Sequence, residues 1–337
     1  MLNFDEERFL RIQSGAVALA DDLHRTIAEC LNKGARNLFF AGSGGAGILM
    51  LPAARLLQTR STFPVYVEMP AELVVTGSPH LGRDSIVVIP SLSGTTKESI
   101  EALAYCQERG ATVITLTGHA DSPLAERADH TFTNFAEDDT SCESFYLQSL
   151  IIALAVMGER GEIDDYAEVV GELKRLPELL LEVKRGFEER AERFAAQIQD
   201  EPYHIITGSG GTWPEAFYYG MCILEEMQWI RTRPVHASDF FHGTLELVEQ
   251  GVSVIVFKGE DETRPLAERV EAFVPQYTDK LSVFDTAEFA LPGISPRVRA
   301  LISPVILATI FERVSAHLEV KRDHPLTTRR YYRRVSY

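Results

Sequence analysis

Two stretches of the sequence, Ala41-Gly42-Ser43-Gly44-Gly45 and Thr207-Gly208-Ser209-Gly210-Gly211, repeat one pattern about a domain length apart. Each follows a short apolar run, at residues 37–40 and 204–206, and each precedes a helical pattern. A glycine loop between a strand and a helix exposes backbone N–H groups that bind anions. One such loop is weak evidence, but two predict a duplicated α/β unit that uses loop amides and serine hydroxyls on an anionic ligand.

Around the first loop, short apolar runs alternate with helical stretches. We predict strands at residues 37–41, 65–68, 85–90, 111–117 and 130–133, and helices at 44–57, 71–76, 97–109 and 123–127. Residues 5–31 carry apolar side chains every three or four positions, which predicts a leading helix. Strands that alternate with helices are typical of a parallel, doubly wound sheet.

The second loop lies in a similar arrangement. Helical patterns at 144–159 and 166–195, interrupted at Pro177, precede strands predicted at 203–207, 252–257 and 280–285 and helices at 213–230, 264–273 and 302–317. The sequence therefore predicts two α/β domains with connecting helices. We expect a leading helix at 1–33, a first domain at 34–160, a helical linker at 161–199, a second domain at 200–320 and a C-terminal tail near the active site at 321–337.

The composition narrows the class of protein. Of the 337 residues, 45% are hydrophobic and 24% are charged, as in soluble globular proteins, and the net charge is −16. An acidic surface repels nucleic acid, so we expect no such partner. We find no uncharged apolar run of about 18 residues and an acidic start unlike a signal peptide, so we expect no membrane contact and a cytoplasmic location. The cysteines and histidines lack metal-binding spacing, so we expect no metal and no other cofactor.

The strongest chemical motif is Pro90-Ser91-Leu92-Ser93-Gly94-Thr95-Thr96-Lys97-Glu98, where a predicted strand meets a predicted helix. Its hydroxyls and backbone amides converge at a helix N-terminus, where the helix dipole also favours an anion. Helix capping by the two threonines would explain one or two of these hydroxyls, but not the whole set. We predict a phosphate site made from both loops: Gly42, Ser43, Gly44, Ser91, Ser93, Gly94 and Thr96.

Residues 91–98 resemble the phosphate loop of SIS (sugar isomerase) domains, which bind phosphosugars, and the resemblance spans nearly the whole chain. Two SIS domains in tandem would account for the repeated loop, and the resemblance implies a flavodoxin-like parallel sheet flanked by helices in each. The second half departs from the pattern, because Lys258-Gly259-Glu260-Asp261-Glu262 stands where hydroxyls are expected. Acidic side chains repel phosphate, so we expect the first domain to bind phosphate and the second to supply catalytic groups.

A third motif, Glu225-Glu226-Met227-Gln228-Trp229 followed by residues 236–243, is similar to the isomerase half of glucosamine-6-phosphate synthase. In that family a helix glutamate moves a proton between C1 and C2 and a histidine before a glycine assists ring opening. The matching residues are Glu226 and His242. Proton transfer beside a carbonyl does need a carboxylate, and ring opening suits a group that titrates near neutral pH. The structural alternatives are a solvated helix carboxylate and a buried core histidine, and Glu225 is the second choice of base.

The C-terminal stretch His324-Pro325-Leu326-Thr327-Thr328-Arg329-Arg330-Tyr331-Tyr332, with the third motif, resembles the fructosamine-6-phosphate deglycases, which include the fructoselysine-6-phosphate and fructose-asparagine-6-phosphate enzymes. Those enzymes hydrolyse a 6-phosphofructosyl amino acid to glucose 6-phosphate and free amino acid. The resemblance implies a sugar phosphate conjugated to an amino acid as substrate and a homodimer, with His242 acting in its own subunit or across the interface. Candidate substrate-binding residues are Ser209, Arg329, Arg330 and Tyr331. A solvated tail is the alternative for the arginine cluster, which also includes Arg333 and Arg334.

Several other functions fit part of the sequence. Residues 42–47 match the glycine pattern of dinucleotide-binding folds, with Glu68 at the end of the next predicted strand, so an NAD-dependent dehydrogenase is one hypothesis. Such a fold requires neither the second loop nor residues 91–98. A phosphosugar isomerase or a glucosamine-6-phosphate deaminase is a nearer alternative, because both use the same proton transfer. A non-catalytic sugar-phosphate-binding protein would have no need of Glu226 and His242.

Overall fold

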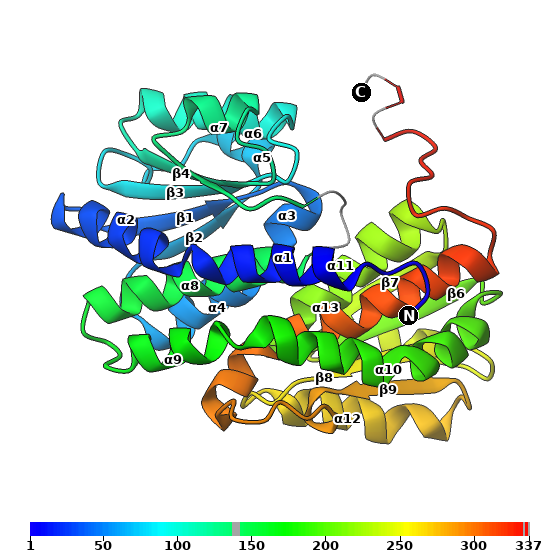
Figure 1. Cartoon of the computed structure of the whole chain (residues 1–337). Helices are drawn as coiled ribbons and strands as arrows, with labels where there is room; N and C mark the ends of the chain where they lie inside the picture. The colour runs from blue at the N-terminus through cyan, green and yellow to red at the C-terminus, as the bar shows by residue number, and fades with distance from the viewer. Residues whose placement is uncertain (137–141, 333, 336–337) are drawn as a thin grey trace. The chain divides into compact units, whose positions relative to one another are not determined.

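The computed structural model describes residues 1–136, 142–332, 334 and 335. The chain forms two compact units, each built on one parallel sheet (Figure 1). The N-terminal unit is Glu7–Pro177, and the C-terminal unit is Glu178–Tyr337 together with Met1–Glu6. The boundary at Pro177 falls inside the helical stretch expected at residues 161–199.

The sheet of the N-terminal unit has five parallel strands in the order β2-β1-β3-β4-β5, which is the order of flavodoxin-like folds. Its strands are β1 (Asn37–Ala41), β2 (Val65–Glu68), β3 (Ser85–Pro90), β4 (Thr112–Thr117) and β5 (His130–Thr133). The central strand β3 is buried along its whole length, as expected of a parallel strand covered on both faces. All five strands agree with the sequence-based prediction to within one residue.

The helices of this unit connect the strands and cover the sheet (Figure 1). They are α1 (Glu6–Ala18), α2 (Ala20–Asn32), α3 (Gly44–Ile48), α4 (Leu51–Arg60), α5 (Pro70–Thr76), α6 (Lys97–Glu108), α7 (Pro123–Arg127), α8 (Glu143–Glu159) and α9 (Tyr166–Leu173). The single leading helix predicted at 5–31 is wrong, because the helix is interrupted at Leu19. The helix predicted at 44–57 is also two helices, since Pro52 has no N–H to continue the first one.

The sheet of the C-terminal unit has the order β7-β6-β8-β9, which repeats the first four positions of the other sheet. Its strands are β6 (Tyr203–Gly208), β7 (Arg231–His236), β8 (Ser253–Lys258) and β9 (Leu281–Asp285). Strand β7 was missed in the sequence. It is a partly exposed edge strand that contains Pro234 and three basic side chains, so it lacks the apolar run by which the other strands were recognised.

The helical elements of the C-terminal unit include one departure from the prediction. They are α10 (Leu176–Ile198), η1 (Gly210–Thr212), α11 (Trp213–Tyr218), η2 (Tyr219–Met227), η3 (Asp239–His242), η4 (Thr244–Leu247), α12 (Arg264–Phe273), η5 (Val274–Gln276), η6 (Thr286–Glu288) and α13 (Pro296–Lys321). The α-helix predicted at 213–230 is wrong beyond Tyr218, because η2 is a π-helix. Helix α13 is long and apolar enough to span a membrane, but 89% of its apolar stretch is buried, so it serves as a core helix.

The first six residues join the C-terminal unit through a buried arginine. Arg313 of α13 is fully buried, and it donates hydrogen bonds to the Leu2 carbonyl and to Glu188, while the Leu2 N–H donates to Glu188 at 2.7 Å. Burial opposes the ionisation of Glu188, but the bonds from Arg313 and Leu2 outweigh it and lower the pKa of Glu188 to about 2. The N-terminal segment is therefore held by polar contacts inside this unit.

Candidate functional site

The two predicted phosphate loops lie at the same edge of the N-terminal sheet. Strands β1 and β3 are adjacent and parallel, so residues 42–44 and 91–96 both follow the carboxyl ends of neighbouring strands. The strand order reverses between β1 and β3, and ligands of open α/β sheets bind at such a topological switch point. A Cβ on Gly42 would lie 2.5 Å from Gly47 Cα and 3.0 Å from Pro90 Cγ. These glycines therefore allow close packing of the loop, which explains their spacing without a dinucleotide.

Residues 91–96 form a compact turn lined with hydroxyls. Ser91 Oγ lies 3.2 Å from Thr96 Oγ1 and accepts a hydrogen bond from the Gly94 N–H at 3.2 Å. Ser93 Oγ accepts from the Thr95 N–H and hydroxyl at 3.3 and 3.0 Å. The structure thus brings the predicted hydroxyls of this motif together in one turn.

Helix α6 begins directly after this turn. Its N-cap residue is Thr96, and the Thr96 side chain makes no capping hydrogen bond to the first-turn amides. The capping explanation would place this hydroxyl on the amide of residue 98 or 99, but it lies beside Ser91 instead. The uncapped first turn of this 12-residue helix, with its positive dipole end, is suited to an anion.

The two copies of the glycine loop share a backbone conformation but differ in what fills them. Gly44 and Gly210 have φ angles of +55° and +52°. Among the described residues, nothing lies within 4 Å of a Cβ on Gly44, whereas a Cβ on Gly210 would lie 2.4 Å from Asp261 Oδ2 and 2.3 Å from Thr263 Oγ1. In the described part of the chain, side chains therefore fill the second loop at Gly210 but not the first loop at Gly44.

Asp261 closes the second loop. Its Oδ2 accepts from the Gly211 N–H at 2.9 Å and its Oδ1 accepts from the Thr263 N–H at 2.8 Å. Ser209 is buried and donates to the Thr263 carbonyl at 3.0 Å. A carboxylate of the chain therefore takes the amide that could have bound an external anion. The assignment of Ser209 to substrate binding stays a prediction, and these contacts weigh against it.

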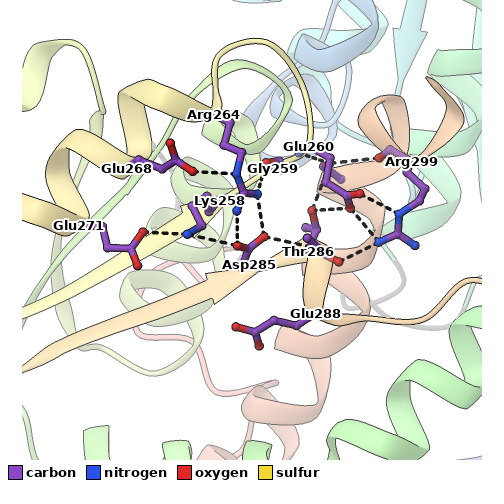
Figure 2. Close-up of polar contacts among 12 residues, drawn as sticks. Lys258, Gly259, Glu260, Arg264, Glu268, Glu271, Asp285, Thr286, Glu288 and Arg299 are labelled. Atoms are coloured by element: carbon purple, nitrogen blue, oxygen red, sulfur yellow. Dashed lines mark hydrogen bonds and ion pairs between the residues drawn. The ribbon is translucent and has the colours of Figure 1, made fainter. Parts of the chain in front are cut away.

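Ion pairs occupy the carboxyl ends of β8 and β9 (Figure 2). Arg264 makes a bidentate ion pair with Asp285, and Arg299 makes a bidentate ion pair with Glu260. Lys258 lies 3.2 Å from Asp285. Burial opposes the ionisation of Asp285, but the hydrogen bonds from Arg264 and Lys258 outweigh it and lower its pKa. Of the acidic residues that replace the expected hydroxyls, Glu260 is thus paired with a basic side chain of the same unit, and Asp261 is bonded to the amides of Gly211 and Thr263.

Glu226 lies on the π-helix η2 and is 33% exposed. Its Oε1 is 2.8 Å from Nε of Arg329, which belongs to the C-terminal tail. Tyr219 of the π-helix packs on Phe311 of α13 with ring centroids 4.5 Å apart, and this contact anchors the π-helix to α13. Segments of π-helix are frequent at functional sites. The structure therefore joins two of the predicted motifs, the helix glutamate and the arginine-rich tail.

Glu225, the second choice of base, is bonded elsewhere. Its Oε1 accepts from the Thr232 hydroxyl at 2.6 Å and from the Thr232 N–H at 3.3 Å. These bonds tie Glu225 to strand β7 and give it a structural role. Glu226 is the one of the two carboxylates that faces the tail.

His242 ends the 3₁₀-helix η3 and is exposed. The alternative of a buried core histidine therefore does not apply. Gly243 follows with a φ of +142°, a conformation that side chains rarely adopt, so the glycine after the histidine is needed for this turn. An exposed imidazole can exchange protons with solvent or with a ligand.

Of the other predicted tail residues, Arg330 contacts the segment that carries Glu226. The Arg330 guanidinium lies 4.1 Å from the centroid of the Trp229 ring, and Tyr331 is exposed. Arg334 is exposed, and Arg333 lies outside the described residues. Within the described ranges, no group of three or more His, Cys, Asp or Glu side chains could hold a metal ion.

Two residues that follow Glu226 were not predicted as site residues. Gln228 donates a hydrogen bond from Nε2 to the His324 carbonyl at 2.8 Å, which ties the third motif to the tail. Trp229 has a φ of +56°, which is rare for a bulky residue. Both residues stand inside the quoted motifs, so the signal was present in the sequence, but their contacts depend on the fold.

Comparison with known proteins agrees with this architecture. The SIS domain model matches residues 33–158. The chain is 29% identical to fructosamine deglycase FrlB of Bacillus subtilis (strain 168) over 89% of this chain and 92% of that protein. It is 26% identical to fructoselysine 6-phosphate deglycase of Escherichia coli (strain K12) over 92% of this chain and 89% of that protein.

A solved structure extends the match to the fold. A Bacillus subtilis protein described as a candidate phosphosugar isomerase has a TM-score of 0.89 and 28% identity, covering 96% of this chain and 99% of that chain. The chain therefore contains an SIS domain at residues 33–158 and a second unit with the same sheet order, and it is homologous over about nine-tenths of its length to fructosamine and fructoselysine 6-phosphate deglycases.

Proposed function

We propose that this protein is a deglycase that hydrolyses a 6-phosphofructosyl amino acid to glucose 6-phosphate and the free amino acid. The observation that carries the proposal is the ion pair between Glu226 and Arg329. It joins the two motifs whose sequences resemble the deglycases, in a chain homologous to such enzymes over most of its length. A candidate base with a dedicated partner is unnecessary in a protein that only binds its ligand.

Phosphate binding belongs to the N-terminal unit in this proposal. The hydroxyls of Ser43, Ser91, Ser93 and Thr96 and the first-turn amides of α6 would hold the 6-phosphate. The net charge of −16 repels phosphate at long range, so the site relies on these local donors. The second glycine loop is filled by Asp261, which supports one phosphate site in each chain.

The chemistry requires proton transfers and water. His242 opens the sugar ring, which frees the C2 carbonyl. Glu226 takes a proton from C1, the C–H electrons form the C1–C2 double bond, and O2 gains a proton, giving an enaminol. The proton then returns to C2 while the nitrogen lone pair forms the C1 imine. Water adds to C1 and the C1–N bond breaks, which leaves the C1 aldehyde of glucose 6-phosphate and the free amine.

The quaternary state and location follow the same proposal. We expect a homodimer, as the SIS resemblance implies, and a cytoplasmic location with no membrane or nucleic-acid partner. Sedimentation of the purified protein checks the first expectation, and cell fractionation checks the second.

The test is release of glucose 6-phosphate, followed with a coupled dehydrogenase, from a panel of 6-phosphofructosyl amino acids. Glucosamine 6-phosphate is tested beside them by release of ammonia, because its deamination leaves fructose 6-phosphate. Release from one conjugate establishes the deglycase and identifies its amine. Turnover of glucosamine 6-phosphate alone makes the protein a deaminase, and no release from any compound contradicts the proposed activity.

A further inference from the structure

We propose that Arg329 is a positioning residue for Glu226, supplied by the C-terminal tail of the same chain. This inference rests on the proposed function, in which Glu226 is the base. The sequence alone placed Arg329 among the candidate substrate-binding residues. Its contacts in the structure point to the Glu226 carboxylate instead.

The Arg329 side chain is fixed on two edges. Its Nη1 donates to the carbonyls of Leu326 and Thr328, at 2.5 and 3.0 Å, and its Nε edge faces Glu226 Oε1 at 2.8 Å. Only 12% of the side chain is exposed. A freely exposed ion pair contributes little because both side chains must be ordered, but here the backbone of the tail has already ordered the guanidinium.

The tail is bonded to the residues that follow Glu226. His324 accepts a hydrogen bond from Gln228, whose side chain is fully buried, and the His324 ring packs edge-on against Trp229 with centroids 4.6 Å apart. Arg330 stacks on the same indole at 4.1 Å. The segment that carries the candidate base and the tail that carries Arg329 are therefore one connected structure.

A second attachment holds the tail at its start. The Leu326 N–H donates to Glu319 Oε1 of α13 at 2.9 Å, and Arg322 donates to the carbonyl of Gln199. Trp229 keeps its φ of +56° within this set of contacts. Such a conformation is unfavourable for a bulky residue and persists only where surrounding contacts impose it, which is common at functional sites.

These contacts have a chemical consequence for the proposed base. A glutamate side chain has several rotatable bonds, and the proposed reaction needs its carboxylate to reach C1 and then C2 of one substrate. A guanidinium anchored to the tail limits the carboxylate to one orientation, which keeps its oxygens where a substrate C–H can reach them. Arg329 acts on the reaction through Glu226 and is not itself a catalytic residue.

The experiment compares Arg329→Ala and Arg329→Lys with Arg193→Ala, a control that removes an exposed arginine of α10. Misplacing a catalytic group by about 1 Å can cost on the order of 10²-fold, so we expect Arg329→Ala to lower kcat by about that factor with little change in KM. Lysine lacks the planar fork and should recover only part of the rate. Guanidinium ion, added well below denaturing concentrations, should raise the kcat of Arg329→Ala but not that of Arg193→Ala.

The outcomes separate the two proposals. Wild-type activity with an unchanged kcat in Arg329→Ala overturns the role of Arg329 and leaves the deglycase intact. A raised KM with an unchanged kcat also overturns it and returns Arg329 to substrate binding. Absence of wild-type turnover on the whole panel refutes the proposed function, and the positioning role with it.

Discussion

Replacing Gly94 with alanine tests whether the turn at residues 91–96 binds phosphate. Gly94 has a φ of +61°, and a Cβ there would lie 2.0 Å from Ser122 Oγ and 2.4 Å from Ser122 Cβ. Ordinary contact begins near 3.4 Å, so the turn must move by roughly 1 Å or more. The left-handed conformation adds roughly 1–2 kcal/mol.

The expected result is a loss of phosphate affinity beyond the loss of stability. The hydroxyls of Ser91 and Ser93 are bonded within this turn, so they move with it. A displacement of about 1 Å breaks phosphate contacts that are each worth about 1.5–3 kcal/mol, which predicts a 10- to 100-fold weaker affinity for glucose 6-phosphate. Isothermal titration of glucose 6-phosphate into the folded variant gives this affinity directly.

Two further variants isolate the cause. Gly161 also has a positive φ, +68°, and a Cβ there would meet nothing within 4 Å, so Gly161→Ala carries the strain without the clash and should bind normally. Adding Ser122→Gly to Gly94→Ala removes the two nearest atoms and leaves Thr117 Oγ1 at 3.1 Å, while glycine still serves as an N-cap at a cost of a few tenths of a kcal/mol. This pair should regain most of the affinity. Wild-type affinity in Gly94→Ala alone would refute the assignment of this turn to phosphate.

Other predictions concern the base, the filled loop and a buried histidine. Glu226→Gln should keep glucose 6-phosphate binding and lose turnover; a variant that retains more than a few per cent of the wild-type rate, about 2 kcal/mol of barrier, contradicts the role. Asp261→Asn should lower the free energy of unfolding by about 1–3 kcal/mol in urea titrations without changing KM, because Asp261 only fills the loop. Burial lowers the pKa of His204 to about 4, so as the pH falls below 6.5 the unfolded chain binds the proton first. Stability should then fall by roughly 3 kcal/mol between pH 6.5 and 4, and His204→Asn should flatten this slope in urea titrations above and below that window.

Much of the fold could be predicted because its signals are local. Strands such as β3 are continuous apolar runs, and the loops at Gly42 and Gly208 mark where a strand passes into a helix. These patterns depend on neighbours in sequence, so this one amino-acid sequence was enough to predict most of the strands. The edge strand β7 was missed because an edge does not require a buried apolar run.

The candidate site likewise combines features that the sequence predicts with features that only the folded structure shows. The residue types and spacings of Ser91–Glu98 and of the segment around Glu226 led to the predictions of phosphate binding and proton transfer, because each of these requires particular side chains. The π-helical form of η2 and the filling of the second loop by Asp261 did not follow from any local pattern.

The pairing of Arg329 with Glu226 was decided by the tertiary structure alone. Two residues far apart in sequence meet only after α13 has packed and the tail has turned back, and no periodicity encodes that meeting. The sequence by itself therefore determined the strands of both sheets except β7, because these depend on short-range patterning, and its residue chemistry led to the predictions of a phosphate turn and a candidate base. Only the tertiary structure decided that Asp261 fills the second glycine loop and that Arg329 pairs with Glu226, because both depend on contacts between distant segments.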